Sequence, residues 1–192
     1  MATGITEKNN NGLFENEVEL NGKYATMARA LKEEFGVFST FREVYVLAAV
    51  LGYLHQRKET EDKTPKVNAA SIFPGDLNKR KADLRFLYRV MMLTNDMEGY
   101  TINDYMDRAF RDDEDQDQDE EESIDTDKTL KGKMKVFNSY ACGGIEYLYE
   151  KLQGNDNQDK VIEIIHDIVH EFAVDINLLE DDTLVDFTPE YD

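Results

Sequence analysis

The sequence has few cysteines, few basic residues and no long apolar run, and these shortages exclude several classes of protein. It contains one cysteine, Cys142, among 192 residues, so no intrachain disulfide can form and nothing indicates an oxidising compartment. No stretch approaches the roughly 20 uncharged apolar residues that a membrane-spanning helix needs. The first twenty residues contain neither the basic nor the apolar region of a signal peptide. We therefore expect a soluble protein of the cytoplasm.

The sequence also lacks the signatures of the commonest enzymes. It contains no P-loop, no G-x-G-x-x-G and no G-x-S-x-G, the motifs of many nucleotide-binding proteins and hydrolases. From the residues alone we predict no catalytic residue and no cofactor. A non-catalytic protein is favoured over an enzyme.

Basic residues are scarce, with 22 Lys and Arg against 41 Asp and Glu and a net charge of −19. Residues 112–127 hold eleven acids and no base, and residues 180–192 hold six acids and no base, so the rest of the chain is nearly neutral. Blocks of like charge are usually solvated and disordered. We expect an acidic disordered insertion at 112–127, mobile and dispensable for folding, and an acidic tail at 180–192.

The remaining chain is predicted to form one helical domain over 21–179, preceded by a flexible segment over 1–20. This polar segment offers four apolar residues as possible docking points: Leu13, Phe14, Val18 and Leu20. Apolar residues recur at steps of three and four, which indicates helices, and no convincing run of alternating strands is found. The expected helices cover 22–35, 41–56, 77–94, 101–111, 130–152 and 159–178.

The fold class is therefore all-α, with five or six helices packed around the helix at 41–56. That helix is apolar around most of its circumference, which is typical of a central, buried helix. Thr40 and Glu43 form a capping-box pattern at its start. Gly36 is placed to end the preceding helix.

Two adjacent glycines interrupt an apolar segment, SYACGGIEYL, at 139–148. The helical stripe continues through them, although each glycine costs roughly 1 kcal/mol in a helix interior. We predict a continuous or kinked helix in which Gly143 and Gly144 let another backbone approach closely; the alternative is a helix break at Gly143. Cys142 has no histidine near it in sequence and is expected to be a small buried residue rather than a reactive thiolate.

The sharpest chemical pattern is HDIVH at 166–170, which resembles the zinc-binding H-E-x-x-H motif. Its acid, Asp167, is one methylene shorter than the usual glutamate, and no third ligand can be identified. His166 and His170 also fall at the edge of the apolar stripe or beyond it. We expect surface histidines and no bound metal, with a small metal-dependent hydrolase that uses this pair as an alternative function.

One concentrated positive patch precedes and enters the helix at 77–94. It comprises Lys79, Arg80, Lys81, Arg85 and Arg89. Such a cluster could contact a partner or phosphates, or form a solvated face, or pair with the acidic insertion. Direct binding of nucleic acid is not favoured in a chain this acidic. A second alternative function, an acidic DNA mimic or antitoxin-like inhibitor, would use the acidic segments instead.

Two stretches resemble a known family. VFSTFREVYVLAAVLGYLHQRKE at 37–59 and VFNSYACGGIEYLYEKL at 136–152 are similar to two helices of the DNA phosphorothioation-associated protein 4 family, small accessory proteins of bacterial Dnd systems. The chain departs from that pattern with Cys142 where asparagine is expected, and with the acidic insertion before the second motif. These are packing motifs, so the resemblance transfers no catalytic residue.

The resemblance implies a setting: sulfur modification of the DNA backbone and the linked restriction of unmodified, often phage, DNA. Sulfur transfer itself needs a cysteine desulfurase and iron–sulfur cysteines, which one buried-looking cysteine cannot supply. The expected function is that of a non-catalytic adaptor that binds other protein components of such a system.

Overall fold

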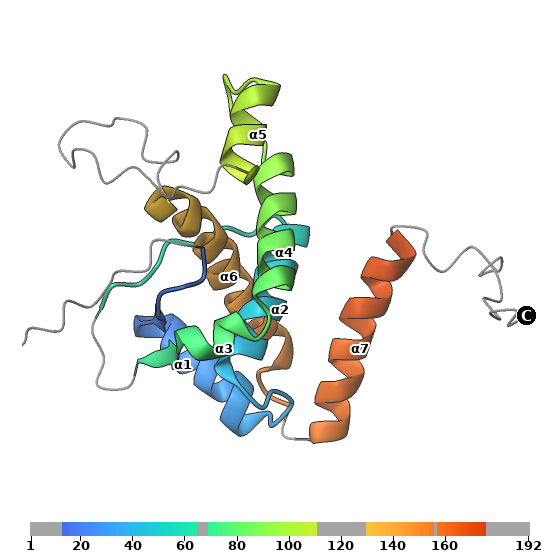
Figure 1. The fold of residues 1–192 in the computed structure, drawn as a ribbon. Coiled ribbons are helices and arrows are strands. Elements are labelled where there is room, and N and C mark those ends of the chain that lie inside the picture. Colours follow the sequence, from blue (N-terminus) through green and yellow to red (C-terminus); the bar gives the residue numbers. More distant parts are fainter. Residues whose placement is uncertain (1–12, 65–68, 111–129, 156, 176–192) are drawn as a thin grey trace, which may run out of the picture.

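The computed structural model describes residues 13–64, 69–110, 130–155 and 157–175, and Figure 1 shows their arrangement. The acidic insertion at 112–127 and the acidic tail at 180–192 lie outside these residues. The elements in chain order are β1 (Val18–Leu20), α1 (Gly22–Arg29), the π-helical turn η1 (Ala30–Glu34), α2 (Phe41–Leu54), β2 (Ala70–Ile72), α3 (Pro74–Asn78), α4 (Lys81–Thr94), α5 (Ile102–Phe110), α6 (Leu130–Leu152) and α7 (Gln158–Asp175).

The fold is mostly α-helical, as predicted, and α2 lies at its centre. The side chains of Val44, Tyr45 and Ala48 on this helix are fully buried. The capping box at its start is confirmed: Glu43 N donates to Thr40 Oγ1 at 3.2 Å, and Thr40 N donates to Glu43 Oε2 at 3.1 Å. These two bonds satisfy backbone donors that an uncapped helix would leave exposed.

Two short strands were not predicted. β1 pairs with β2 in antiparallel register, with Val18 opposite Ile72 and Leu20 opposite Ala70. Each strand has three residues, which is too short for a period of two to be recognised. The sheet joins the start of the described chain to the segment that enters α3.

The prediction of a flexible segment over 1–20 is therefore wrong from Leu13 onward. Residues 1–12 lie outside the described ranges. Three of the four apolar residues named as possible docking points, Leu13, Phe14 and Leu20, are buried in the core. The ring of Phe14 packs edge-on against Phe137 of α6, with centroids 5.1 Å apart. Burial of large apolar side chains like these contributes about 1.5–3 kcal/mol each, enough to hold an otherwise polar segment in place.

Two of the expected helices differ in detail. The helix predicted at 22–35 changes into the π-helical turn η1, where Phe35 N donates to Ala30 O at 3.0 Å; Gly36 follows with φ +66°, as predicted. The helix predicted at 77–94 is two helices. Pro74 occupies the first turn of α3, where its missing N–H costs nothing, and α4 begins afresh at Lys81.

The glycine pair lies within the continuous helix α6, and the predicted close approach of backbones is confirmed. A Cβ atom built on Gly144 would lie 1.7 Å from the carbonyl oxygen of Ala48 in α2. One built on Gly143 would lie 2.1 Å from the carbonyl oxygen of Arg57, in the segment after α2. The contact is reciprocal, because a Cβ on Gly52 of α2 would lie 1.9 Å from the carbonyl oxygen of Tyr140. Helices α2 and α6 therefore touch through their backbones.

We predict that Gly144→Ala lowers the free energy of unfolding and that Gly144→Leu lowers it further. Both side chains must displace the backbone of α2, and overpacking of this kind typically costs about 1–3 kcal/mol. Gly75→Ala in α3 is the matched control: no atom lies within 4 Å of its added Cβ, so helix propensity should leave stability unchanged or up to ~1 kcal/mol higher. Urea denaturation of the three variants checks this. Stabilisation by Gly144→Ala would contradict the contact.

Candidate functional site

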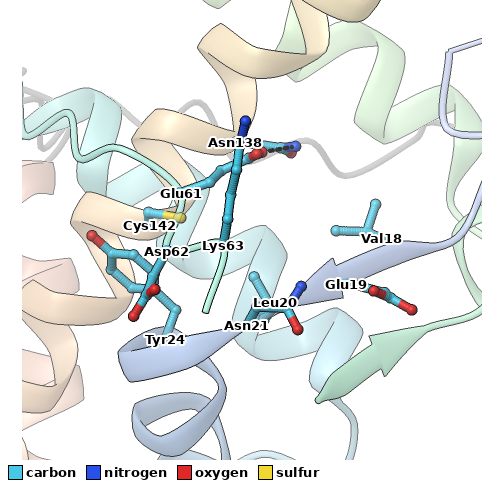
Figure 2. Close-up of a pocket in the computed structure, with 10 residues that line it drawn as sticks. All are labelled: Val18, Glu19, Leu20, Asn21, Tyr24, Glu61, Asp62, Lys63, Asn138 and Cys142. Atoms are coloured by element: carbon cyan, nitrogen blue, oxygen red, sulfur yellow. Dashed lines mark hydrogen bonds between the residues drawn. The ribbon is translucent and has the colours of Figure 1, made fainter. Parts of the chain in front are cut away.

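A small pocket opens where β1, the start of α1, the segment after α2 and helix α6 meet (Figure 2). Its volume is about 130 Å³, enough for a few water molecules or a small ion. It is lined by Val18, Glu19, Leu20, Asn21, Tyr24, Glu61, Asp62, Lys63, Asn138 and Cys142. Three of these are carboxylates and one is the chain's single cysteine, so the pocket is the first place to look for chemistry.

The carboxylate of Asp62 acts as a cap for α1. Its Oδ2 atom accepts from Lys23 N at 2.9 Å, and its Oδ1 atom accepts from Thr64 N at 2.9 Å. The residue at the usual capping position, Asn21, makes no side-chain hydrogen bond to this helix. Asp62 therefore satisfies a helix donor from 39 residues away, with its negative charge at the positive end of the helix dipole.

The carboxylate of Glu61 ends a chain of hydrogen bonds that begins in the core. The hydroxyl of fully buried Tyr45 donates to Asn138 Oδ1, and Asn138 Nδ2 donates to Glu61 Oε1 at 2.6 Å. The chain fixes the segment after α2 onto α6, as does the hydrogen bond from Glu59 N to Ser139 O at 3.0 Å. Glu61 and Asp62 therefore both have structural roles at this pocket: Glu61 bonds the segment after α2 to α6, and Asp62 caps α1.

Cys142 lies at the base of the pocket, with 2% of its surface exposed. Burial, together with the nearby charge of Glu61, raises the pKa of its thiol from 9.0 to about 12. A thiol with that pKa carries almost no thiolate at neutral pH, and the thiolate is the nucleophilic form. The expected burial of Cys142 is confirmed, and its low reactivity stays a prediction.

The basic cluster does not form one site. Lys79 pairs with Asp76 at 2.8 Å, Arg80 pairs with Asp83 at 3.1 Å, and Lys81 pairs with Glu15. Because three of its five cations are matched by nearby acids, the cluster attracts phosphates less than its composition suggested. The two i,i+3 pairs could have been found from the sequence; the pair with Glu15 depends on the unexpected fold of the first segment.

The other two members of the cluster, Arg85 and Arg89, lie further along α4. The Nε atom of each is buried without a hydrogen-bond partner among the described residues. The guanidinium carbon of Arg89 lies 5.1 Å from the ring centroid of Phe110, a cation–π distance. Arg89 therefore contributes to the contact between α4 and α5 as well as to the charge of the surface.

His166 and His170 are exposed on α7 with their rings stacked, centroids 5.9 Å apart. His166 Nδ1 lies 3.5 Å from Asp167 Oδ1. Within the described ranges, no group of three or more His, Cys, Asp or Glu side chains is arranged to hold a metal ion. The third ligand that the zinc hypothesis needs is not supplied by those residues.

A face of exposed apolar side chains runs along α5. Ile102, Met106 and Phe110 follow one another at steps of four, so they share one side of the helix, and they are 73%, 46% and 45% exposed. Phe86 on α4 is also strongly exposed, one helical turn before the Arg89 that covers Phe110. Large apolar side chains gathered in this way are typical of surfaces that bind another protein. The apolar spacing placed these residues in a helix, but nothing in the sequence indicated that this face would be exposed in the described structure.

Comparison with known proteins found no match to a family model, to a curated protein or to a solved structure. No helix of the described chain is both long enough and apolar enough to cross a membrane.

We predict that Cys142 of the folded protein reacts with iodoacetamide at least about 10³-fold more slowly at pH 8 than in the unfolded chain, since its pKa is about three units higher. The folded rate should still rise tenfold per pH unit between 8 and 10, whereas the unfolded rate levels off near pH 9. Mass spectrometry of the alkylated protein measures both rates. A folded rate that levels off near neutral pH would reveal an activated thiolate.

We also predict that the purified protein carries no stoichiometric zinc. The double substitution of His166 and His170 by alanine should change the free energy of unfolding by no more than the roughly 0.5 kcal/mol typical of surface positions. Elemental analysis and urea denaturation test this. One tightly held zinc per chain, lost in the double variant, would favour the hydrolase alternative.

Proposed function

We propose that this protein is a non-catalytic accessory protein of a bacterial DNA phosphorothioation-linked modification and restriction system of the Dnd type. It would act in the cytoplasm by binding other protein components of that system. The assignment to Dnd systems rests on the resemblance of 37–59 and 136–152 to the phosphorothioation-associated family. The exposed apolar face of α5 is the observation that supports action through protein contacts.

The two resembling stretches are neighbours in space. The first contains α2 and the second lies in α6, and the glycine contact between Gly52, Gly143 and Gly144 joins them. The residues that carry the resemblance therefore belong to one packed unit, in which small side chains and hydrogen bonds have a structural purpose. This arrangement supports a shared architecture with the accessory-protein family. It assigns no chemical role to α2 or α6.

The α5 face has the composition of an interface. Its exposed apolar side chains are those of Ile102, Met106 and Phe110. The guanidinium of Arg89 lies over the Phe110 ring and adds a positive charge. Aromatic residues, methionine and arginine are enriched at protein interfaces. Full burial of an exposed side chain of this kind contributes about 1.5–3 kcal/mol. Because these three are only 45–73% exposed, a partner that covered them would gain a part of that free energy for each.

We predict that the double substitution Ile102→Asp, Met106→Asp abolishes binding to the partner protein without lowering the thermal midpoint of unfolding. Two carboxylates on the face would have to be desolvated in the complex, whereas in the free protein they remain in water. Ile162→Asp is the matched control, because Ile162 is 51% exposed on α7, away from this face. The control variant should bind like the original protein.

The measurement is co-purification of the tagged protein with each of the other Dnd components, expressed pairwise, followed by calorimetry on any complex. Binding that the α5 substitutions leave unchanged would place the interface elsewhere. Failure of every pairwise combination would contradict membership of such a system.

A further inference from the structure

A buried arginine without a partner lies on the inner side of α5. Arg108 is 3% exposed, yet its Nε and both Nη atoms have no hydrogen-bond partner in the described part of the chain. No carboxylate within the described ranges forms an ion pair with it. The nearest aromatic contact is the ring of Tyr100, 5.9 Å from the guanidinium carbon. Five N–H donors of a permanent cation are therefore held out of water with nothing to accept from them.

A second buried donor follows α4. Asn95 is also 3% exposed, and its Nδ2 atom has no partner among the described residues. Its Oδ1 atom is satisfied twice, accepting from the Tyr140 hydroxyl at 2.8 Å and from the Lys58 ammonium. These two bonds fix the amide so that its NH₂ group, and not its oxygen, remains available.

Tyr140 is linked to both groups. Its hydroxyl bonds Asn95, and the pKa of that hydroxyl is raised by burial and lowered, to a smaller extent, by the positive charge of Arg108. The hydroxyl of Tyr88 also donates to the backbone oxygen of Arg108 at 3.2 Å, which ties this turn of α5 to α4. The arginine is held in place from two sides.

The unmet donors are costly. Burying an ion without a partner is strongly destabilising, and leaving a buried amide N–H group unsatisfied is unfavourable as well. Arg57 differs from Arg108, because its two Nη atoms bond both carboxylate oxygens of Glu150, at 2.7 and 3.0 Å, near the surface. Arg108 is more deeply buried and has no such partner among the described residues, so the group that would satisfy it is an acceptor with negative charge.

We propose that Arg108 and Asn95 form a binding site for a small oxyanion from outside the chain. The planar guanidinium fork is suited to two oxygens of one phosphate or carboxylate group, and Asn95 Nδ2 would donate to the same group. Lys58 is exposed and bonds Asn95, so the site lies one side chain below the surface. This inference does not depend on the proposed function. The two residues of the proposed site, Arg108 and Asn95, lie outside both stretches that carry the family resemblance. Lys58 and Tyr140 lie within those stretches and serve here only as neighbours of the site.

The test is the thermal midpoint of the full chain in potassium phosphate or potassium acetate, with potassium chloride at equal ionic strength as reference. We expect one of the two oxyanions to raise the midpoint, by roughly 5–10 °C at about one hundred times its dissociation constant. The anion that acts identifies the group bound. Arg108→Met should abolish the shift and raise the midpoint in chloride, because it removes an unpaired buried charge while keeping most of the volume.

Arg80→Met is the matched control, since it removes a surface arginine that is already paired with Asp83, and it should keep the full anion response. Arg108→Lys retains the charge without the fork and should weaken the response severalfold, which provides a test even if the methionine variant does not fold. A shift that Arg108→Met leaves intact, or no shift with either anion, would overturn the proposal. So would a shift that appears only after deletion of 112–127, because the chain's own carboxylates would then be the acceptor.

Discussion

The backbone contact between α2 and α6 is the constraint on which the rest of the structure depends. Where Gly144 meets Ala48 and Gly52 meets Tyr140, the helices lie so close that no side chain fits between them. Close approach multiplies the dispersion contacts of both helices and offsets the roughly 1 kcal/mol that each glycine costs in a helix. It also sets the path of the chain beyond α2, since the Arg57 carbonyl lies over Gly143.

That path explains why the pocket exists and why two of its carboxylates bond to other parts of the fold. The segment after α2 is held against α6 by backbone and side-chain hydrogen bonds, and Asp62 then reaches the start of α1. The pocket is the space left where three elements converge on this segment. The carboxylates of Glu61 and Asp62 accept hydrogen bonds from other segments, and burial raises the pKa of the Cys142 thiol, which favours its protonated form.

The sequence predicted most of the helices and the glycine contact because both depend on local pattern. Spacing of apolar residues, the Thr40–Glu43 cap and the two adjacent glycines are all visible in short windows. Strands of three residues, the break before Lys81 and the Asp62 cap depend on contacts between distant segments, and no local signal reports them. The candidate sites were predicted less well for the same reason: nothing in the local sequence around Arg108 indicates a buried charge, and its burial depends on the packing of α5 against α4.

The helix pair has a consequence for how the length of the chain can vary. Ala48 and Gly144 are brought together across the whole segment that contains the acidic residues 112–127. The entropy of closing such a loop grows only with the logarithm of its length, so removing sixteen of roughly one hundred residues changes that cost by about 0.2 kcal/mol. A change in the length of the 112–127 insertion therefore costs little closure entropy, and the α2–α6 contact can stay the same.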